Sequence, residues 1–444
     1  MINMKYSQYN VIFETQNKYY IYNTLSTAIA EINENVYNLI NTNNLKNLDE
    51  KYYQIMFDQH FIVDSNSNEV EEYLYFYDYI RFTKTAKVLS VTFIPTYNCN
   101  LKCSYCMQGN VKDNKSIVPE DIDKILLFVE SQIISSQKIG IPITKLHVGL
   151  YGGEPLTQKE SIKIFIEKMF DYSKKYNCEI KYSMTSNMTL LDDDVLSLIK
   201  RYKISTQISI DGCQKNHDVR RTKLDGSGTY SIIVNNLKKL VSNGLKEYIV
   251  IRINIDKENL LEAEDILKEI RDYSNDIYFG FLDTFSGLND SFSNQCISSE
   301  IYPQIISKKL DEISKKYKFI IPARFGKQSP CAMNCINKYF IDLYLNVYKC
   351  EMFINKPEVS VGRISSDGRF IPNAGFYHQI NRSPKSFSEC MSCLLLPMCA
   401  GGCAGKSYIN GETKNVILNE KYCMYDKNAL LEYLKEYVIN HTII

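Results

Sequence analysis

The sequence lacks several features that would mark common protein classes. It has no tryptophan and only 5 histidines, and 52 basic residues nearly balance 51 acidic ones, which leaves a formal net charge of +1. That balance argues against nucleic acid as a partner, and so few histidines argue against Cys/His zinc fingers. No apolar run of 18 residues and no signal-peptide pattern occur, so we expect a cytoplasmic protein with no membrane partner.

Cysteine is the residue in excess, since the 444-residue chain holds 14 of them. A cytoplasmic protein keeps its thiols reduced, so clustered cysteines indicate metal binding before disulfides. Ligation by thiolates alone leaves two alternatives open, namely zinc Cys₄ sites and iron–sulfur clusters.

Residues 1–85 have the pattern of a small separate domain in which short strands precede helices. The expected elements are strands at 9–14 and 19–22 and helices at 27–40, 48–57 and 69–82. This order predicts a winged-helix-like module.

Residues 86–325 alternate strand and helix, which predicts an α/β fold with a parallel sheet. The expected strands are 89–94, 145–150, 180–184, 204–210, 248–253 and 277–281, and the expected helices are 122–133, 161–175, 194–201, 229–242 and 260–273. Six such units can curl into a full or partial (β/α) barrel. The segment is not a Rossmann domain, because no G-x-G-x-x-G follows its first strand.

Residues 326–444 break this alternation and hold eight of the 14 cysteines. We expect a loop-rich domain stapled by metal, closed by a helix at 428–437.

Three cysteines, Cys99, Cys103 and Cys106, directly follow the first strand of the middle segment in a C-x₃-C-x₂-C spacing. Thiolates this close can bind three irons of one cubane cluster. Because no fourth cysteine is near, the fourth iron stays open for chemistry. In a (β/α) barrel, the loop after a strand lies at the face where catalytic residues gather.

With Tyr105 before its third cysteine, this motif resembles the signature of the radical S-adenosylmethionine (SAM) enzymes. The resemblance implies a partial (β/α)₆ TIM-like barrel and a [4Fe–4S] cluster whose open iron chelates SAM. It also implies reductive cleavage of SAM to a 5′-deoxyadenosyl radical that abstracts a substrate hydrogen, and an electron donor such as flavodoxin or ferredoxin.

Further motifs resemble those of the same family and come in the expected order: Gly152-Gly153-Glu154-Pro155, Thr185-Ser186-Asn187, Ser209-Ile210-Asp211-Gly212 and the run from His217 to Arg221. The resemblance implies that the SAM site includes Tyr105, Gly152, Gly153, Glu154, Ser186, Asn187, Ser209, Asp211 and Arg221. Glycine at 152 and 153 would let the backbone approach a ligand closely. The fifth strand, 251–254, is a further candidate for the adenine side.

The C-terminal cysteines resemble the SPASM extension of radical SAM enzymes, which binds two auxiliary [4Fe–4S] clusters and brings the expected total to three. The resemblance assigns Cys331, Cys335, Cys350 and Cys403 to the first cluster and Cys390, Cys393, Cys399 and Cys423 to the second. A pair of zinc sites is the alternative. Two departures stand out: Leu345 replaces the family's usual glycine, and only three residues separate Cys331 from Cys335. If Cys331 points away, the first auxiliary cluster keeps an open iron.

Glu351 follows Cys350, as a carboxylate follows the matching cysteine in sulfatase maturases. The resemblance therefore implies a general base, with a surface glutamate as the alternative.

Taken together, these motifs predict a maturase of ribosomally made precursor peptides. The N-terminal module would capture the peptide at a sheet edge, or serve as a simple cap. The expected product is a thioether or another cross-link, with epimerisation also open. A sulfatase maturase that makes formylglycine from Cys or Ser is the enzymatic alternative, and a non-catalytic metal- or peptide-binding protein is the alternative of another class.

Overall fold

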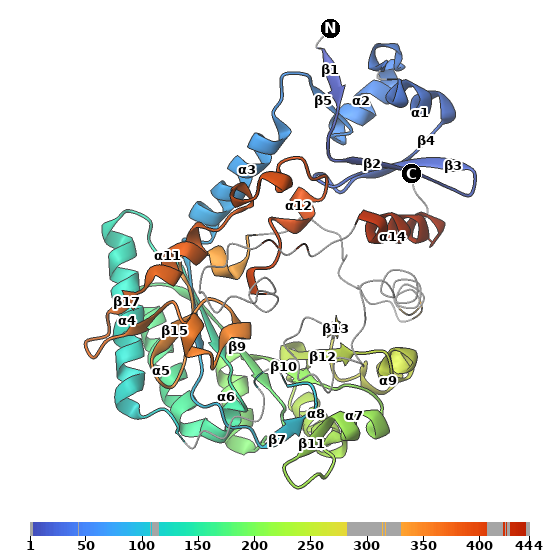
Figure 1. Ribbon diagram of the computed structural model, residues 1–444. Helices are drawn as coiled ribbons and strands as arrows, with labels where there is room; N and C mark the ends of the chain where they lie inside the picture. The colour runs from blue at the N-terminus through green and yellow to red at the C-terminus, as the bar shows by residue number, and fades with distance from the viewer. Residues whose placement is uncertain are drawn as a thin grey trace.

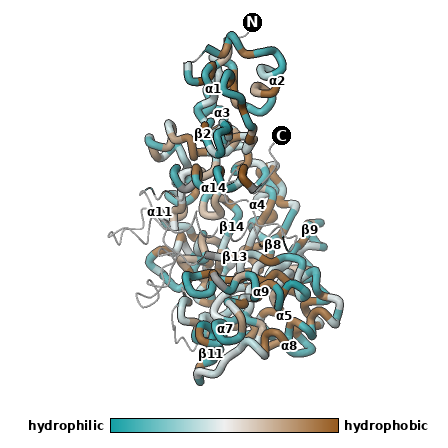
Figure 2. Tube along the Cα trace, turned by 90° about the vertical axis from the view of Figure 1, so that its right-hand side faces the viewer, coloured by the Kyte–Doolittle hydropathy of each residue, from teal (hydrophilic) through white to brown (hydrophobic). Residues whose placement is uncertain are grey.

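The computed structural model (Figure 1) describes residues 3–42, 44–106, 108, 115–281, 313, 316, 330–405, 421, 423 and 427–440. Two views at right angles (Figures 1 and 2) place the N-terminal module at one end of the molecule. Helices α7 (Gln214–Arg220) and α8 (Tyr230–Ser242) lie at the other end.

The N-terminal module is built on a three-stranded antiparallel sheet. Its strands are β2 (Asn10–Thr15), β3 (Lys18–Asn23) and β4 (Ile29–Ile32), and β1 (Met4–Tyr6) pairs separately with β5 (Ile62–Asp64). The helices are α1 (Glu34–Asn41), α2 (Glu50–Asp58) and α3 (Glu69–Tyr79), followed by a π-helical turn, Ile80–Lys84.

The expected helix at 27–40 is wrong in its first part. Thr27 has a φ of 64°, which a regular helix does not tolerate, and residues 29–32 pair with β3 instead. The helix begins only after Asn33, whose side chain accepts a hydrogen bond of 2.9 Å from the amide of Val36. Tertiary pairing therefore overrides local helical pattern here.

Helices cover both faces of this sheet. On one face, Ile21 and Ile32 pack with residues of α1 and α2. On the other face, Phe13 and Tyr22 pack with Leu434 of α14 (Lys427–Asn440), so the C-terminal helix closes the N-terminal module. The two ends of the chain are thus parts of one packed unit (Figure 1).

The middle segment is the expected α/β unit, a partial barrel of parallel strands. The strands are β6 (Val88–Phe93), β8 (Lys145–Leu150), β9 (Glu179–Ser186), β10 (Ser205–Ser209), β12 (Ile249–Ile255) and β13 (Asp276–Phe281). The outer helices are α4 (Pro119–Lys138), α5 (Lys159–Lys175), α6 (Asp193–Tyr202), α8 and α9 (Ala263–Ile270). Their apolar faces bury the main core against the sheet.

This sheet does not stop at the expected boundary near residue 325. Strand β14 (Lys338–Ile341) pairs in parallel with β6, and β15 (Asn346–Tyr348), β16 (Gly362–Ile364) and β17 (Phe370–Pro372) extend the sheet antiparallel to ten strands. Strands of three or four residues are too short to show a period in the sequence. The C-terminal segment also carries α11 (Ala374–Asn381) and α12 (Leu396–Cys399). In the described part of the chain, no helix is long and apolar enough to span a bilayer.

Candidate active site

The loop with Cys99, Cys103 and Cys106 leaves the carboxyl end of β6. The amide of Glu154 donates to the carbonyl of Asn98 over 2.9 Å, which ties this loop to the turn after β8. A short antiparallel pair, β7 (Leu101–Cys103) with β11 (Arg221–Lys223), places Cys103 directly opposite Arg221. The loop is therefore fixed from two sides before any ligand is considered.

The two glycines after β8 are needed by this loop. A Cβ at Gly152 would lie 2.4 Å from the carbonyl oxygen of Thr96, and one at Gly153 would lie 2.2 Å from that of Asn98. Gly152 also has a φ of 138°. We expected these glycines to admit a ligand, whereas what approaches them in the structure is the backbone of the cysteine loop.

Glu154 is the buried carboxylate of this turn, with 1% of its surface exposed. It accepts hydrogen bonds from the amide of Asn187 (2.7 Å), the amide of Leu156 (3.0 Å) and the hydroxyl of Ser186 (2.8 Å). Burial raises the pKa of Glu154, and these three donors oppose that rise. The side-chain amide of Asn187 in turn lies 3.8 Å from the sulfur of Cys99, so Asn187 contacts the cysteine loop directly and Ser186 is linked to it through Glu154.

Tyr105, Asp211, Arg221 and Asn254 form a second buried network. The Tyr105 hydroxyl donates to Asp211 and accepts from Arg221 (2.6 Å) and Asn254 (3.1 Å). Both the amide and the side chain of Asn254 donate to the other oxygen of Asp211, over 3.0 and 2.9 Å. Asp211 is fully buried and both of its oxygens already have hydrogen-bond partners. It therefore holds Tyr105 and Asn254 in place.

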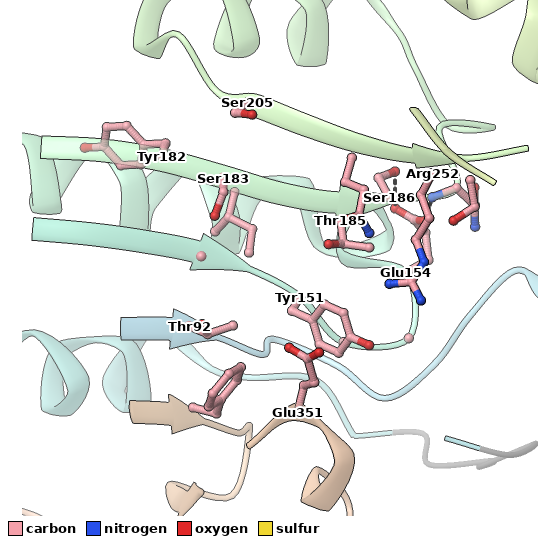
Figure 3. A pocket seen from close by; sticks show the side chains of 18 of the residues that line it. Thr92, Tyr151, Glu154, Tyr182, Ser183, Thr185, Ser186, Ser205, Arg252 and Glu351 are labelled. Atoms are coloured by element: carbon pink, nitrogen blue, oxygen red, sulfur yellow. Dashed lines mark hydrogen bonds between the residues drawn. The ribbon is translucent and has the colours of Figure 1, made fainter. Parts of the chain in front are cut away.

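These elements surround a cavity of about 1220 Å³ inside the partial barrel. The predicted residues that line it are Cys99, Cys103, Tyr105, Cys106, Gly152, Gly153, Glu154, Ser186, Asn187, Ser209, Arg221 and Glu351. Figure 3 shows Glu351 pointing at Tyr151 across the cavity from Arg252.

Arg252 and Asn254 of β12, within the strand 251–254 that the sequence offered as a candidate, line the cavity, whereas Gln207 of β10 and Tyr278 of β13 were missed. Arg252 donates to the side chain of Asn254 over 2.8 Å, and the Tyr278 hydroxyl donates to Gln207 over 2.6 Å. Polar residues at alternate positions of these strands were the available signal, because alternate residues share one face of a strand.

Two of the three thiols of the loop, those of Cys99 and Cys103, have raised pKa values. Burial raises the pKa of Cys99 to about 12 and also raises the pKa of Cys103. The positive charge of Arg221 opposes the rise at Cys103. Metal ligation requires the thiolate and reverses this preference. Within the described residues, no three Cys, His, Asp or Glu side chains converge on a single ion. A cubane does not require that, because each thiolate binds a different iron.

Residues 93–270 match the model of the radical SAM superfamily. The chain carries a radical SAM domain. The domain indicates an enzyme of radical chemistry, and it implies SAM and a [4Fe–4S] cluster as cofactors.

Relatives and solved structures extend the likeness beyond this domain. The cysteine-type anaerobic sulfatase-maturating enzyme of Clostridium novyi is 22% identical over 77% of this chain and 96% of its own length. The antilisterial bacteriocin subtilosin biosynthesis protein AlbA of Bacillus subtilis is 23% identical over 78% of this chain and 72% of its own. The crystal structure of Streptococcus suis SuiB bound to precursor peptide SuiA covers 94% of this chain and all of its own, with 14% identity and a TM-score of 0.52.

The site fits the cofactors that the radical SAM domain implies. Three thiols reach one end of the cavity. The guanidinium of Arg221 is buried beside Cys103, and its Nε has no hydrogen-bond partner among the described residues. An orphaned buried donor next to thiols is a site for an anionic group.

Outside the radical SAM domain, the C-terminal cysteines gather in two neighbourhoods. Cys350 lies within electrostatic reach of Cys331 and Cys403, and Cys331 within reach of Cys335. In the second neighbourhood, Cys390 lies within reach of Cys393, Cys399 and Cys423. The assignment of these eight cysteines to two clusters stays a prediction.

The remaining predictions about single residues have simple structural counterparts. Leu345 adopts a φ of 64°, the backbone conformation that favours the glycine it replaces. His217 is fully buried between the amide of Asp211 and the hydroxyl of Thr229. Cys178 is buried beside the carbonyl of Ile143, whereas Cys296 lies outside the described residues.

Proposed function

We propose that this chain modifies a ribosomally made precursor peptide by radical SAM chemistry. One observation carries the proposal. The cysteine loop, Glu154 and Arg221 are linked to one another and line one cavity, which is large enough for SAM and a peptide segment. When bound, SAM and the reduced cluster supply a 5′-deoxyadenosyl radical, and the protein supplies binding, orientation and exclusion of water.

In this proposal Cys99, Cys103 and Cys106 hold the catalytic cluster. Glu154 and Arg221 bind opposite charges of SAM, the carboxylate taking the ammonium and the guanidinium the carboxylate. Ser186 and Asn187 orient Glu154, while Tyr105 and Asp211 orient Arg221. Ser209, Gly152 and Gly153 complete the wall of the SAM site.

The peptide as substrate is supported by how far the likenesses extend. The sulfatase-maturating relative aligns with 77% of this chain, whereas the peptide-bound SuiB structure aligns with 94% of it. We propose that residues 1–85 form the module that captures the peptide. AlbA, named for the biosynthesis of a bacteriocin, is a sequence relative that also favours a peptide.

Two auxiliary [4Fe–4S] clusters complete the proposed enzyme. Cys331, Cys335, Cys350 and Cys403 hold the first and Cys390, Cys393, Cys399 and Cys423 the second, in line with the two neighbourhoods described above. Four thiolates for each cluster leave neither with an open iron.

Glu351 is the proposed general base. It lines the cavity and faces Tyr151, on the side opposite Arg252 (Figure 3). Once a hydrogen atom has been removed, a carboxylate here could take a proton from the peptide, and the remaining electron would pass to an auxiliary cluster, whose proposed ligand Cys350 is adjacent in sequence.

The test is anaerobic turnover of the full-length, cluster-reconstituted protein with a chemical reductant. We expect 5′-deoxyadenosine from the wild type and none from Cys99→Ala, with Cys178→Ala as a control that leaves the site intact. Short peptides encoded beside the gene are added next, and mass spectrometry should find one that loses two hydrogens. Absence of 5′-deoxyadenosine from fully loaded wild-type protein would refute the proposal.

A sulfatase maturase is the second candidate, favoured by the alignment with 96% of the Clostridium novyi enzyme. That activity makes an aldehyde, which a hydrazide probe captures. If a Cys-containing sulfatase peptide becomes hydrazide-reactive and no cross-linked peptide forms, this candidate replaces the first.

A further inference from the structure

Helix α3 of the N-terminal module carries two buried hydroxyls that nothing in the described structure satisfies. Tyr73 and Tyr77 are 2% and 3% exposed, and neither hydroxyl has a hydrogen-bond partner among the described residues. Leaving a buried polar group unpaired costs about 1–3 kcal/mol. Two such groups one helical turn apart therefore indicate partners that the protein alone does not provide.

Both tyrosines lie near cysteines of the C-terminal segment. Tyr73 lies within electrostatic reach of Cys390 and Cys399, which belong to the second set. Tyr77 lies within reach of Cys331 and Cys335, which belong to the first. The two rings are 6.3 Å apart, so one face of α3 spans the two cysteine sets.

The packing around α3 shows that this arrangement is part of a formed core. Tyr73, Tyr77 and Cys390 belong to one buried cluster together with Phe387 and Leu396. Figure 1 shows α3 running alongside the segment that carries α11 and α12. The hydroxyls are therefore held in place by packing on both sides.

Arg382 adds a positive charge between the same two sets. Its side chain is 6% exposed, and one terminal nitrogen donates to the carbonyl of Gly401 over 3.0 Å. Its Nε has no partner among the described residues. Its electrostatic neighbours are Cys331 and Cys403 from the first set, Cys390 from the second, and Tyr77. Because a guanidinium can only donate, the missing partner is an acceptor.

We propose that Tyr73, Tyr77 and Arg382 are positioning residues that donate hydrogen bonds to the sulfur atoms of the two auxiliary clusters. Tyr73 serves the cluster on Cys390, Cys393, Cys399 and Cys423, and Tyr77 serves the cluster on Cys331, Cys335, Cys350 and Cys403. Arg382 lies between the two clusters. The inference rests on the proposal that both sets hold clusters.

The physical effect is on the reduction potentials. A reduced cluster carries one more negative charge than the oxidised one, so donors to its sulfurs stabilise the reduced form and raise the potential. Because α3 belongs to the N-terminal module, that module becomes part of the redox machinery as well as a candidate peptide-binding unit.

The experiment is an EPR-monitored redox titration of the full chain carrying Cys99→Ala, Cys103→Ala and Cys106→Ala. These substitutions remove the catalytic cluster, so the auxiliary clusters give the remaining signals. Tyr73→Phe should lower the potential of one cluster and Tyr77→Phe that of the other. For each, the ratio of reduced to oxidised cluster at the wild-type midpoint should fall about fivefold, the effect of one hydrogen bond. Tyr6→Phe is the matched control, because it removes a buried hydroxyl of β1 that packs in the other core of the same module.

Signal assignment comes from adding Cys399→Ala, which should abolish the Tyr73→Phe effect and leave the Tyr77→Phe effect. Pulsed EPR in D₂O on the protein that keeps both tyrosines provides a readout that does not depend on the folding of the tyrosine variants. A strongly coupled exchangeable deuteron is expected at each cluster. A further deuteron coupling, from Arg382, should remain in both tyrosine variants and should weaken in Arg382→Lys.

The outcomes separate the two proposals. The wild type should hold about 12 iron atoms, as three [4Fe–4S] clusters require. An iron content of one cluster would refute the auxiliary clusters themselves. Full iron with no exchangeable deuteron, or with tyrosine variants that titrate like Tyr6→Phe, would overturn this inference and leave the proposed function standing.

Discussion

Gly153→Ala tests whether the turn after β8 exists to hold the cysteine loop. The added Cβ would lie 2.2 Å from the carbonyl oxygen of Asn98 and 2.3 Å from that of Tyr97, whereas real contacts of this kind essentially never fall below 3.0 Å. Both obstructing atoms belong to the backbone, so no side chain can rotate away. The loop must move by nearly 1 Å, and overpacking of this kind costs about 1–3 kcal/mol of folding free energy.

The effect on chemistry should exceed the effect on stability. The displaced carbonyl of Asn98 also accepts the amide of Glu154, so both the loop before Cys99 and the carboxylate shift together. A misplacement of about 1 Å at a reacting centre can cost about 100-fold in rate. We expect Gly153→Ala to retain its fold by circular dichroism and to make 5′-deoxyadenosine about 100-fold more slowly.

Gly149→Ala, within β8 itself, is the matched control. Its Cβ would meet the side chain of Thr92 at 2.7 Å, and that side chain can change rotamer. Gly149→Ala should therefore lose little of its rate of SAM cleavage. Equal rates for wild type and Gly153→Ala, measured by quantifying 5′-deoxyadenosine at matched iron content, would refute the reasoning.

Three further outcomes are expected. Tyr105→Phe removes the hydroxyl shared by Asp211 and Arg221, so urea unfolding should show a loss of about 1–3 kcal/mol, and an unchanged midpoint would contradict this. Burial lowers the pKa of His217 from 6.5 to about 4. The contribution of neutral His217 to stability is thus present above pH 6.5 and is lost as the pH falls toward 4. Between pH 6.5 and 5, the wild type should lose about 2 kcal/mol of unfolding free energy that His217→Gln does not lose. Leu434 is 2% exposed between α14 and the N-terminal sheet, so Leu434→Ala leaves a cavity that should cost about 2–5 kcal/mol of stability. Hydrogen exchange should therefore become faster in β2 and β3 but not in β8.

The barrel was predictable because its strands and helices are long enough to show a period. The expected strand at 145–150 matches β8, and the other five core strands differ from expectation by one or two residues at either end. Strand β4 was missed because its four residues take their conformation from pairing with β3. Strands β14 to β17 were missed for the same reason, since isolated stretches this short carry no reliable pattern.

The site was predictable in its members and less so in their roles. The motifs named about a third of the residues that line the cavity, because each motif follows one strand and the carboxyl ends of parallel strands meet. Sequence could not show that Asp211 gives both of its oxygens to Tyr105 and Asn254. Hydrogen-bond partners from separate strands depend on the closure of the sheet, which local patterns do not encode.

The packing of the three segments also bears on how the enzyme is built. Helix α14 closes the N-terminal sheet, and α3 covers Cys390 together with Phe387 and Leu396. Arg81, just after α3, is buried and donates to the carbonyl of Asn334, next to Cys335. The N-terminal module therefore contacts both cysteine sets through buried surfaces. The N-terminal module and the cysteine-bearing C-terminal segment therefore share a buried core beside the radical SAM domain.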